Sequence, residues 1–453
     1  MSTMSYIGYS GMRAAQVALS ATSQNVANIN TPGFSRLTTV LGSLGSNGGI
    51  SVGGGVSVLD VRRISDNFSN QQLWRATSDM HRYGSAQDYL GPLEDILGGE
   101  GSSVSIGLDD FYSALGEASD KPQSIAARQQ ILNEMKNLAQ RFNGQNTHIN
   151  RELDTLREQR ASMGKEINGL ASNLAELNQR IVAAEAVGAD TSALRDHRDT
   201  LVTDLSKYAD VRVAEQDDGS LTVSLANGQP LVIGDTAGAL EITRNATGGQ
   251  DISLVFAGAT FGMRQDNIGG ALSGLYETEK NQLLPARETL REMASALTDM
   301  INNTMRTGFD LNGNPGQDWL EYDAATGVLT VMDLMPEELA FSSAATEEGN
   351  NEVLLDFIAL KDRAVLIGGS TLSLNEAYAG LLGGVASASR QNQANLKTAT
   401  EVTVQSQARR DSISAVSMDE EAYNLMEYNR LYQANMKVIE TANQMFQNIL
   451  TAF

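Results

Sequence analysis

Few residues in this sequence have the types and spacing that catalysis or metal binding requires. The three histidines, His81, His148 and His197, are isolated from one another, and neither a His-Glu-x-x-His nor a Gly-x-Ser-x-Gly motif occurs. His197 lies in the charged run Arg195-Asp196-His197-Arg198-Asp199, which has the composition of a catalytic cluster. Charges at this spacing also pair on a helix surface or between helices, and we favour that interpretation.

A second candidate for chemistry is a calcium loop. The stretch from Asp310 to Gly316 reads Asp-Leu-Asn-Gly-Asn-Pro-Gly, and Glu321 falls at the twelfth position of such a loop. The sixth position, where a calcium loop needs glycine, is Pro315, so an Asx-rich turn is the favoured interpretation. The chain has no cysteine, which excludes disulfides, thiol nucleophiles and thiolate metal sites. We predict no enzyme activity, no cofactor and no metal site.

The composition is that of an acidic, folded protein. A length of 453 residues suffices for about three domains with a buried core, and 41% apolar residues argue against disorder. The net charge of −22 predicts that the chain binds neither nucleic acid nor an anionic membrane surface. No apolar run approaches the roughly 18 residues of a transmembrane helix, and the first residues do not resemble a signal peptide. By themselves these features predict a cytosolic protein.

A small-residue amphipathic helix is predicted from residue 12 to residue 29. Its apolar positions alternate at spacings of three and four, as in a helix that packs along another helix. They are Met12, Ala15, Leu19, Thr22, Val26 and Ile29. The helix should end at Asn30-Thr31-Pro32-Gly33, because proline has no N–H, and asparagine and glycine tolerate a left-handed turn.

A matching helix is predicted at the other end of the chain, with two apolar columns. The first column alternates spacings of three and four, through Leu425, Tyr428, Tyr432, Asn435, Ile439, Ala442, Phe446, Ile449 and Phe453. The second repeats every seven residues, through Leu431, Val438, Met445 and Ala452. Two columns require more than one partner, and a helix of roughly 50 Å would project from a compact domain. Two terminal helices that cap a globular core would show the same periodicity.

The most regular segment extends from residue 125 to residue 184. One heptad register contains Leu132, Met135, Ala139, Phe142, Ile149, Leu153, Leu156, Met163, Ile167, Leu170, Leu174, Leu177, Ile181 and Ala184. Polar residues interrupt this register only at Arg128, Asn146 and Arg160. The pattern predicts a helix on the order of 90 Å long with a coiled-coil seam. We expect the seam to face helices of the same chain in an antiparallel bundle rather than a second copy.

Between residues 210 and 265 the apolar pattern changes to period two, with hairpin signals at Asp218-Gly219, Asn227-Gly228 and Gly248-Gly249. A helical pattern resumes from Ile268 to Thr307, so we predict an inserted antiparallel β-domain. The glycine-rich residues 35–65 predict a flexible loop that leads into a short strand.

The predicted fold class is therefore mainly α with a small β insert. A terminal α-helical coiled coil is joined to an elongated helical bundle, and the bundle carries the inserted antiparallel β-domain. The expected domains are residues 1–35 with 415–453, residues 36–209 with 266–307 and 350–414, the insert 210–265, and an irregular outer excursion 308–349.

Both ends of the chain carry a family resemblance. Ser-Gln-Asn-Val-Ala-Asn-Ile-Asn-Thr-Pro-Gly-Phe, residues 23–34, resembles the N-terminal signature of the axial proteins of the bacterial flagellum, which include rod, hook and hook-associated proteins. Residues 432–445 resemble the matching C-terminal signature. Residues 418–426, 195–202 and 308–316 are similar to the version in the first hook–filament junction proteins, the hook-associated protein 1 family.

This resemblance implies a structural protein of the flagellum that joins hook to filament and polymerises through its terminal helices. The implied partners are further copies of the chain, the hook protein, the second hook–filament junction protein and a flagellar export chaperone. Export without a cleaved signal peptide is also implied, which overrides the cytosolic expectation. The alternatives are a hook or rod protein, or a secreted enzyme or binding module that uses flagellar-type ends for export.

The predicted assembly contacts lie on the two terminal helices and on the turn after the first. At the N-terminal end they are Met12, Ala15, Leu19, Val26, Asn28, Ile29, Pro32, Gly33 and Phe34. At the C-terminal end they are Leu425, Tyr428, Leu431, Tyr432, Val438, Ile439, Met445, Phe446 and Ile449. The first apolar column of the C-terminal helix is expected to meet the N-terminal helix, which leaves the second free for neighbouring copies.

Overall fold

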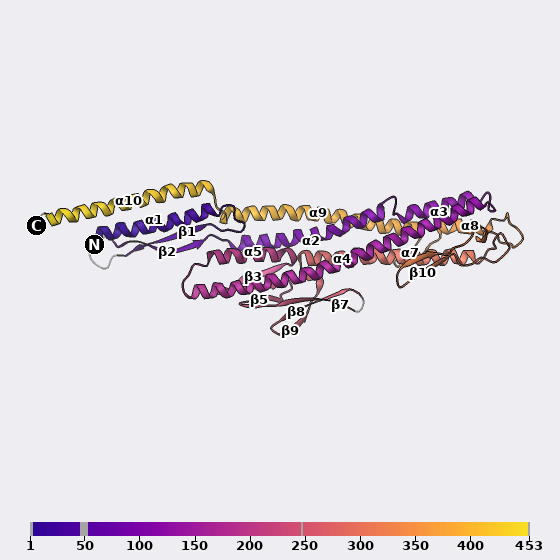
Figure 1. The fold of residues 1–453 in the computed structure, drawn as a ribbon, viewed down its shortest axis with the longest axis horizontal. Helices are drawn as coiled ribbons and strands as arrows, with labels where there is room; N and C mark the ends of the chain where they lie inside the picture. Colours follow the sequence, from indigo (N-terminus) through magenta and orange to yellow (C-terminus); the bar gives the residue numbers. More distant parts are fainter. Residues whose placement is uncertain (1–2, 46–52, 246–247, 452–453) are drawn as a thin grey trace.

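The computed structural model describes residues 3–45, 53–245 and 248–451, and it shows a long, narrow molecule (Figure 1). Both termini lie at one end, where α1 and α10 run side by side, and a helical bundle extends away from them. The helices are α1 (Thr3–Ala27), α2 (Asn67–Gly98), α3 (Val104–Ala118), α4 (Ile125–Ala186), α5 (Ser192–Tyr208), α6 (Gly270–Thr278), α7 (Leu284–Met305), α8 (Glu352–Ala359), α9 (Leu374–Ser414) and α10 (Met418–Thr451). Within the described ranges, none of them is long and apolar enough to span a membrane.

All the sheets are small and antiparallel. A hairpin of β1 (Leu37–Leu44) and β2 (Gly55–Arg63) follows α1. The insert after α5 has two sheets: β3 (Val211–Glu215), β4 (Leu221–Leu225), β5 (Pro230–Ile233) and β6 (Thr236–Ala237), then β7 (Ala239–Arg244), β8 (Gln250–Phe256) and β9 (Ala259–Gly262). Two further hairpins are β10 (Leu320–Asp323) with β11 (Val328–Val331), and β12 (Val365–Ile367) with β13 (Ser370–Leu372).

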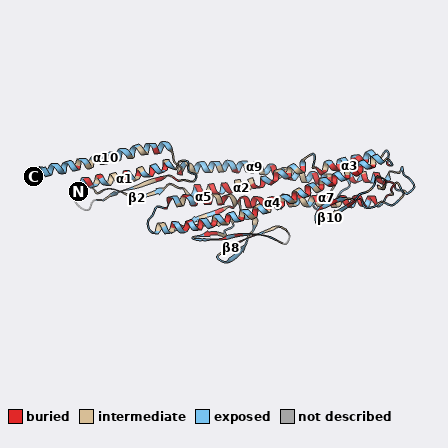
Figure 2. Ribbon diagram, viewed as in Figure 1, coloured by how far each residue is buried: buried red, intermediate tan, exposed pale blue. Residues whose placement is uncertain are grey.

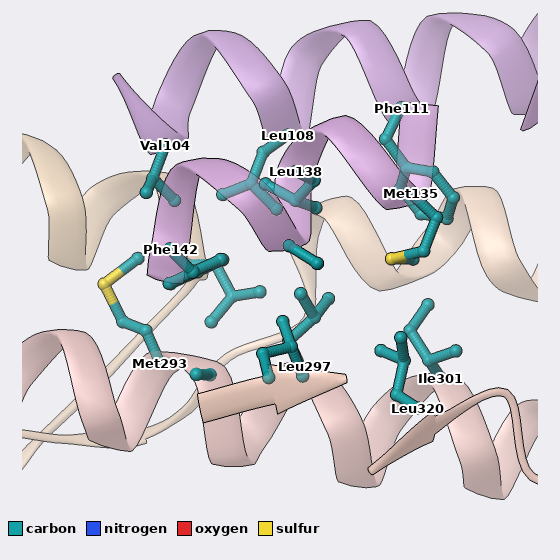
Figure 3. Close-up of a cluster of buried hydrophobic side chains, with 14 of the residues drawn as sticks. Val104, Leu108, Phe111, Met135, Leu138, Phe142, Met293, Leu297, Ile301 and Leu320 are labelled. Carbon is teal, nitrogen blue, oxygen red and sulfur yellow. The ribbon is translucent and has the colours of Figure 1, made fainter. Parts of the chain in front are cut away.

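Two apolar cores hold the bundle together along its length. In the core farther from the termini, side chains of α3, α4, α7 and β10 interdigitate, as Figure 3 shows for Val104, Leu108, Phe111, Met135, Leu138, Phe142, Met293, Leu297, Ile301 and Leu320. The second core lies between α4, α5 and the β insert. Met163 of α4 packs against both cores, so α4 connects them. Burial of the apolar side chains in these two cores stabilises the elongated bundle.

Helix α4 confirms the predicted long helix and its seam. Every apolar seam position is buried except Met163, Leu170 and Ala184, which are half-buried. The three polar seam residues are also buried, and each binds a different segment of the chain. Arg128 donates to the carbonyls of Pro122 and Leu339, Asn146 donates to that of Thr326, and Arg160 pairs with Glu279. Polar residues on the seam thus select which segments lie against α4.

The β insert is attached to α4 by asparagine side chains. Asn178 donates to the carbonyl of Leu221 at 2.8 Å and accepts from its N–H at 3.0 Å. Asn168 does the same with Leu240, at 2.9 and 2.7 Å. A helix side chain therefore satisfies both backbone groups of a strand residue, as a neighbouring strand would. The predicted fold class, a helical molecule with an antiparallel insert, is confirmed.

Four segments differ from the sequence-based expectations. The excursion 308–349 is not irregular throughout, because it contains the β10–β11 hairpin, and Leu320 of β10 is buried in the first core. Leu37–Leu44 and Gly55–Arg63 pair as the β1–β2 hairpin, where the sequence predicted a loop before one short strand, and this hairpin packs on α1. Gly48 and Gly49 of this region lie outside the described residues. Helix α1 already begins at Thr3 rather than at residue 12. The helix predicted from Ile268 is interrupted by a π-helical turn, Glu279–Leu283, where Glu279 turns toward Arg157 and Arg160 of α4.

Candidate assembly interface

Helices α1 and α10 approach each other closely because α1 presents small residues to α10. A Cβ atom on Gly8 would lie 2.9 Å from Cγ1 of Ile439, and one on Gly11 would overlap the side chain of Asn435. The buried residues of α1 are accordingly small or polar: Ser5, Gly8, Ala14, Ala15, Ala18, Ala21, Thr22 and Asn25. The pair is held by close backbone approach rather than by large side chains.

Asn25 joins α1, the hairpin and α10 at one point. Its side chain is almost wholly buried, and its Nδ2 donates to the carbonyl of Leu37 and to Oε1 of Glu421, both at 3.0 Å. Its Oδ1 accepts from the N–H of Leu37 at 2.8 Å. Asn25 was not among the predicted contact residues, although it lies within the N-terminal signature. An amide inside a small-residue helix was the signal that could have identified it.

Most of α10 is exposed (Figure 2). Among its described residues only Glu421 and Ala442 are buried. Its exposed large apolar residues extend along the helix: Met418, Tyr423, Met426, Leu431, Met436, Met445, Phe446, Ile449 and Leu450. Apolar surface of this extent is typical of an interaction site.

A turn after α1 connects the terminal helices to α5 of the bundle. Gly33 has a φ of +81° there and lies so close to Thr200 that a side chain would overlap it. The N–H of Ser35 donates to Oδ2 of Asp196 at 3.0 Å. Arg63, at the end of β2, donates to Asp196 at 2.8 Å and to Asp199 at 2.7 Å. The charged run on α5 is therefore a joint between segments, and His197 within it is exposed.

At this joint, charged side chains and backbone groups have partners both on α5 and on α9. Burial opposes the charge of Arg63, but Asp199 and Asp196 outweigh it, so the pKa of its guanidinium lies above the ordinary value. On the α9 side, Arg410 donates to the carbonyl of Gly33 at 2.9 Å. The N–H of Arg36 donates to the carbonyl of Ser414 at 2.8 Å. These contacts fix the direction in which the terminal helices leave the bundle.

The second candidate for chemistry, the loop at Asp310, closes on itself. Its carboxylate accepts from the N–H groups of Asn312 and Asn314 and from the Asn314 side chain, which is the geometry of an Asx turn. Glu321 is an exposed residue of β10, paired with Thr330. In the part of the chain that the structure describes, no three residues among His, Cys, Asp and Glu are placed to hold a metal ion.

The bundle and the terminal helices each match a known family. The model of the flagellar hook-associated protein FlgK helical domain matches residues 90–320, just over half of the chain. The chain belongs to the FlgK family. Its two ends match models of a flagella basal body rod protein, over residues 6–34, and of the flagellar basal body rod FlgEFG protein C-terminal region, over residues 408–452. A FlgK-family chain with these ends is a structural component of the bacterial flagellum, as the sequence predicted.

Curated relatives cover nearly the whole chain. It is 25% identical to flagellar hook-associated protein 1 of Escherichia coli K12, over 99% of this chain and 100% of that protein. The corresponding protein of Bacillus subtilis is 24% identical over 97% of this chain and 96% of its own length. Among solved structures, the flagellar hook junction protein FlgK from Burkholderia pseudomallei has the same fold. Its TM-score is 0.70 at 15% identity, and the match covers 76% of this chain and all of that one.

The structure places the predicted contact residues of this FlgK-family chain at different depths. On the N-terminal side Ala15 is buried, Pro32 is exposed, and the others are half-buried: Met12, Leu19, Val26, Asn28, Ile29, Gly33 and Phe34. On α10 the half-buried residues are Leu425, Tyr428, Tyr432, Val438 and Ile439. The exposed residues are Leu431, Met445, Phe446 and Ile449.

The two apolar columns of α10 do not divide as expected. Phe446 and Ile449, expected to meet α1, are each 57% exposed, because α10 extends past the described end of α1 (Figure 1). Val438, expected to be free, has its Cγ1 3.2 Å from the position of a Cβ on Gly8. The last members of the two columns, Ala452 and Phe453, lie outside the described residues. A single α1 with small side chains contacts parts of both columns and covers neither.

Proposed function

We propose that this chain polymerises through its terminal helices and joins the flagellar hook to the filament. One observation carries the proposal: α1 presents small residues to α10, while many large apolar side chains of α10, such as Met445, Phe446 and Ile449, remain exposed. A helix pair that leaves so much apolar surface in water is stabilised when other copies cover it. In a polymer, the exposed residues of α10 would face neighbouring copies.

The proposed partners follow from this position in the flagellum. The hook protein would lie on the cell-proximal side, and the second hook–filament junction protein on the distal side. An export chaperone would cover the apolar residues of α10 before secretion. The chain would be exported without a cleaved signal peptide, would lie extracellularly at the hook–filament junction, and would be required for filament assembly and motility.

We also propose a division of the chain into assembly and outer parts. The terminal part contains residues 1–35 with 415–453 and, because the hairpin packs on α1, residues 37–63 as well. The bundle would then contain residues from about 66 to 209, together with residues 266–307 and 350–414. The insert 210–265 and the excursion 308–349 would lie on the outside of the assembled structure.

Localisation on intact flagella tests the proposal. An antibody against the β insert should label one narrow band where hook meets filament. Labelling along the whole hook would instead indicate a hook protein. Labelling of purified basal bodies alone would indicate a rod protein. A secreted enzyme or binding module would give no band at all.

A further inference from the structure

The start of α10 buries a carboxylate that has only one hydrogen-bond donor. Glu421 is 4% exposed, and its Oε1 accepts from Asn25. Its Oε2 is also buried, but it has no hydrogen-bond partner. The position in the first turns of α10 favours a negative charge, because the helix dipole is positive at this end. Even so, a buried carboxylate oxygen without a donor is unfavourable, and a donor that reaches it gains a strong interaction.

Glu421 lines a pocket between α1, β1 and α10. The pocket has a volume of about 250 Å³, and Ala18, Leu37 and Tyr428 also line it. A water molecule occupies about 30 Å³ in the liquid, so the pocket is large enough to admit a side chain. Arg36 is the one cationic side chain among the described residues that line the pocket, and it is already paired with Glu420 at 2.7 Å.

The pocket has a negative character. Burial, together with the charges of Glu427 and Glu421, raises the pKa of the Tyr428 hydroxyl above its ordinary value. A cation is therefore the complementary ligand for this site. Guanidinium suits it best, because it is weakly hydrated and presents several N–H donors in one plane.

We propose that an arginine of a second copy enters this pocket and donates to Oε2 of Glu421. The inference rests on the proposed polymerisation, which brings second copies to the terminal helices. Arg13 on α1 and Arg430 on α10 are exposed, and neither makes an ion pair with any described residue. Such a contact would also offset the repulsion between copies that each carry a net charge of −22.

The test compares two adjacent glutamates in the full-length chain, expressed in cells that lack the native copy. Glu421→Gln keeps the shape and the acceptor for Asn25 but removes the charge. Glu420→Gln is the matched control, because its side chain is 61% exposed. The fraction of hooks with the junction band should fall about tenfold or more for Glu421→Gln and should stay at the wild-type level for Glu420→Gln.

Charge reversal identifies the arginine. Glu421→Arg should abolish the band, and combining it with either Arg13→Glu or Arg430→Glu should restore the band in one of the two cases. Thermal melts of the purified variants should match wild type, which separates lost assembly from misfolding. A wild-type band in Glu421→Gln, or a loss that neither reversal restores, would overturn the inference. If the wild-type chain itself gives no junction band, the proposed function fails instead.

Discussion

The two ends of this molecule use opposite packing strategies. Around α4, large apolar side chains from α3, α7 and the β insert fill two cores, and buried arginines and asparagines bind backbone groups of particular segments. Around α1, the residues that face α10 are mainly small, and many large apolar side chains of α10 remain exposed to water. We therefore expect the bundle to fold alone, and we propose that the terminal helices complete their packing only with further copies.

Removing the C-terminal helix should abolish assembly but leave the folding of the bundle intact, and this is the largest contrast that we expect. Deleting residues 425–453 should abolish the junction band completely, because α1 and the hairpin lose their partner. The bundle should keep its thermal transition, since its cores contain no residue of α10. Circular dichroism melts and electron microscopy of flagella measure the two effects. Loss of the bundle transition would show that the two regions fold as one unit.

Hydrogen exchange on the monomer should give the next largest contrast. Residues 3–35 and 420–451 should exchange almost without protection, because a helix pair with so little buried apolar surface is marginal alone. Amides of α4 near Leu138 and Ile149 should exchange only through global unfolding, many orders of magnitude more slowly. Comparable protection in both regions would mean that the terminal part is stable without neighbouring copies.

Glu279→Ala should destabilise the bundle by about 3–5 kcal/mol, because it leaves Arg160 buried without its charge partner. Asp318→Ala is the matched control. It breaks the exposed pair with Arg306 and should leave the urea midpoint nearly unchanged, because solvent screens this pair. Urea unfolding at neutral pH measures both. Equal effects would contradict the expectation that Arg160 depends on its buried charge partner.

In each region an asparagine side chain binds both backbone groups of one strand residue, and substituting these asparagines compares the two contacts. Asn178→Ala should cost the bundle about 1–3 kcal/mol, because both backbone groups of Leu221 lose a partner inside the second core. Asn25→Ala removes the equivalent contacts with Leu37 and should leave the urea midpoint of the monomer unchanged while it reduces incorporation at the junction. A midpoint shift as large for Asn25→Ala as for Asn178→Ala would assign Asn25 to monomer stability.

The smallest effect should be a pH dependence confined to the bundle. Burial, with Glu152 and Asp88 nearby, raises the pKa of Tyr89 to about 12, and its hydroxyl donates to Gln159 at 2.7 Å. The unfolded chain ionises this tyrosine near pH 10, so stability is full below pH 10 and falls between pH 10 and 12. Tyr89→Phe should reduce this fall in the urea midpoint. An unchanged pH profile would remove Tyr89 as its source.

Strong periodicity made the helices predictable from sequence. The heptads from Leu132 to Ile181 indicated α4 and its buried face, because a sustained seven-residue repeat has no other compact solution. Period-two alternation likewise located the β insert, and Gly33 adopted the positive φ expected for the end of the first helical region. The signatures at the two ends identified the family, since they are local sequences that need no tertiary structure to recognise.

Contacts between distant segments could not be derived in this way. Nothing local indicates that Asp196 accepts from Ser35 and Arg63. Nor does anything local indicate that Asn25 binds Glu421, which lies 396 residues further along the chain. The β1–β2 hairpin was likewise hidden, because its glycines indicate only flexibility until the two strands pair on α1.

Sequence alone determined the long helices, the inserted β-domain and the family, because these depend on periodicity and short signatures. Tertiary structure alone decided how deeply each apolar column of α10 is buried, because that depends on the small side chains and the length of the helix opposite. It also decided that Glu421 lies in a pocket with one oxygen unpaired, since that requires α1, β1 and α10 to meet.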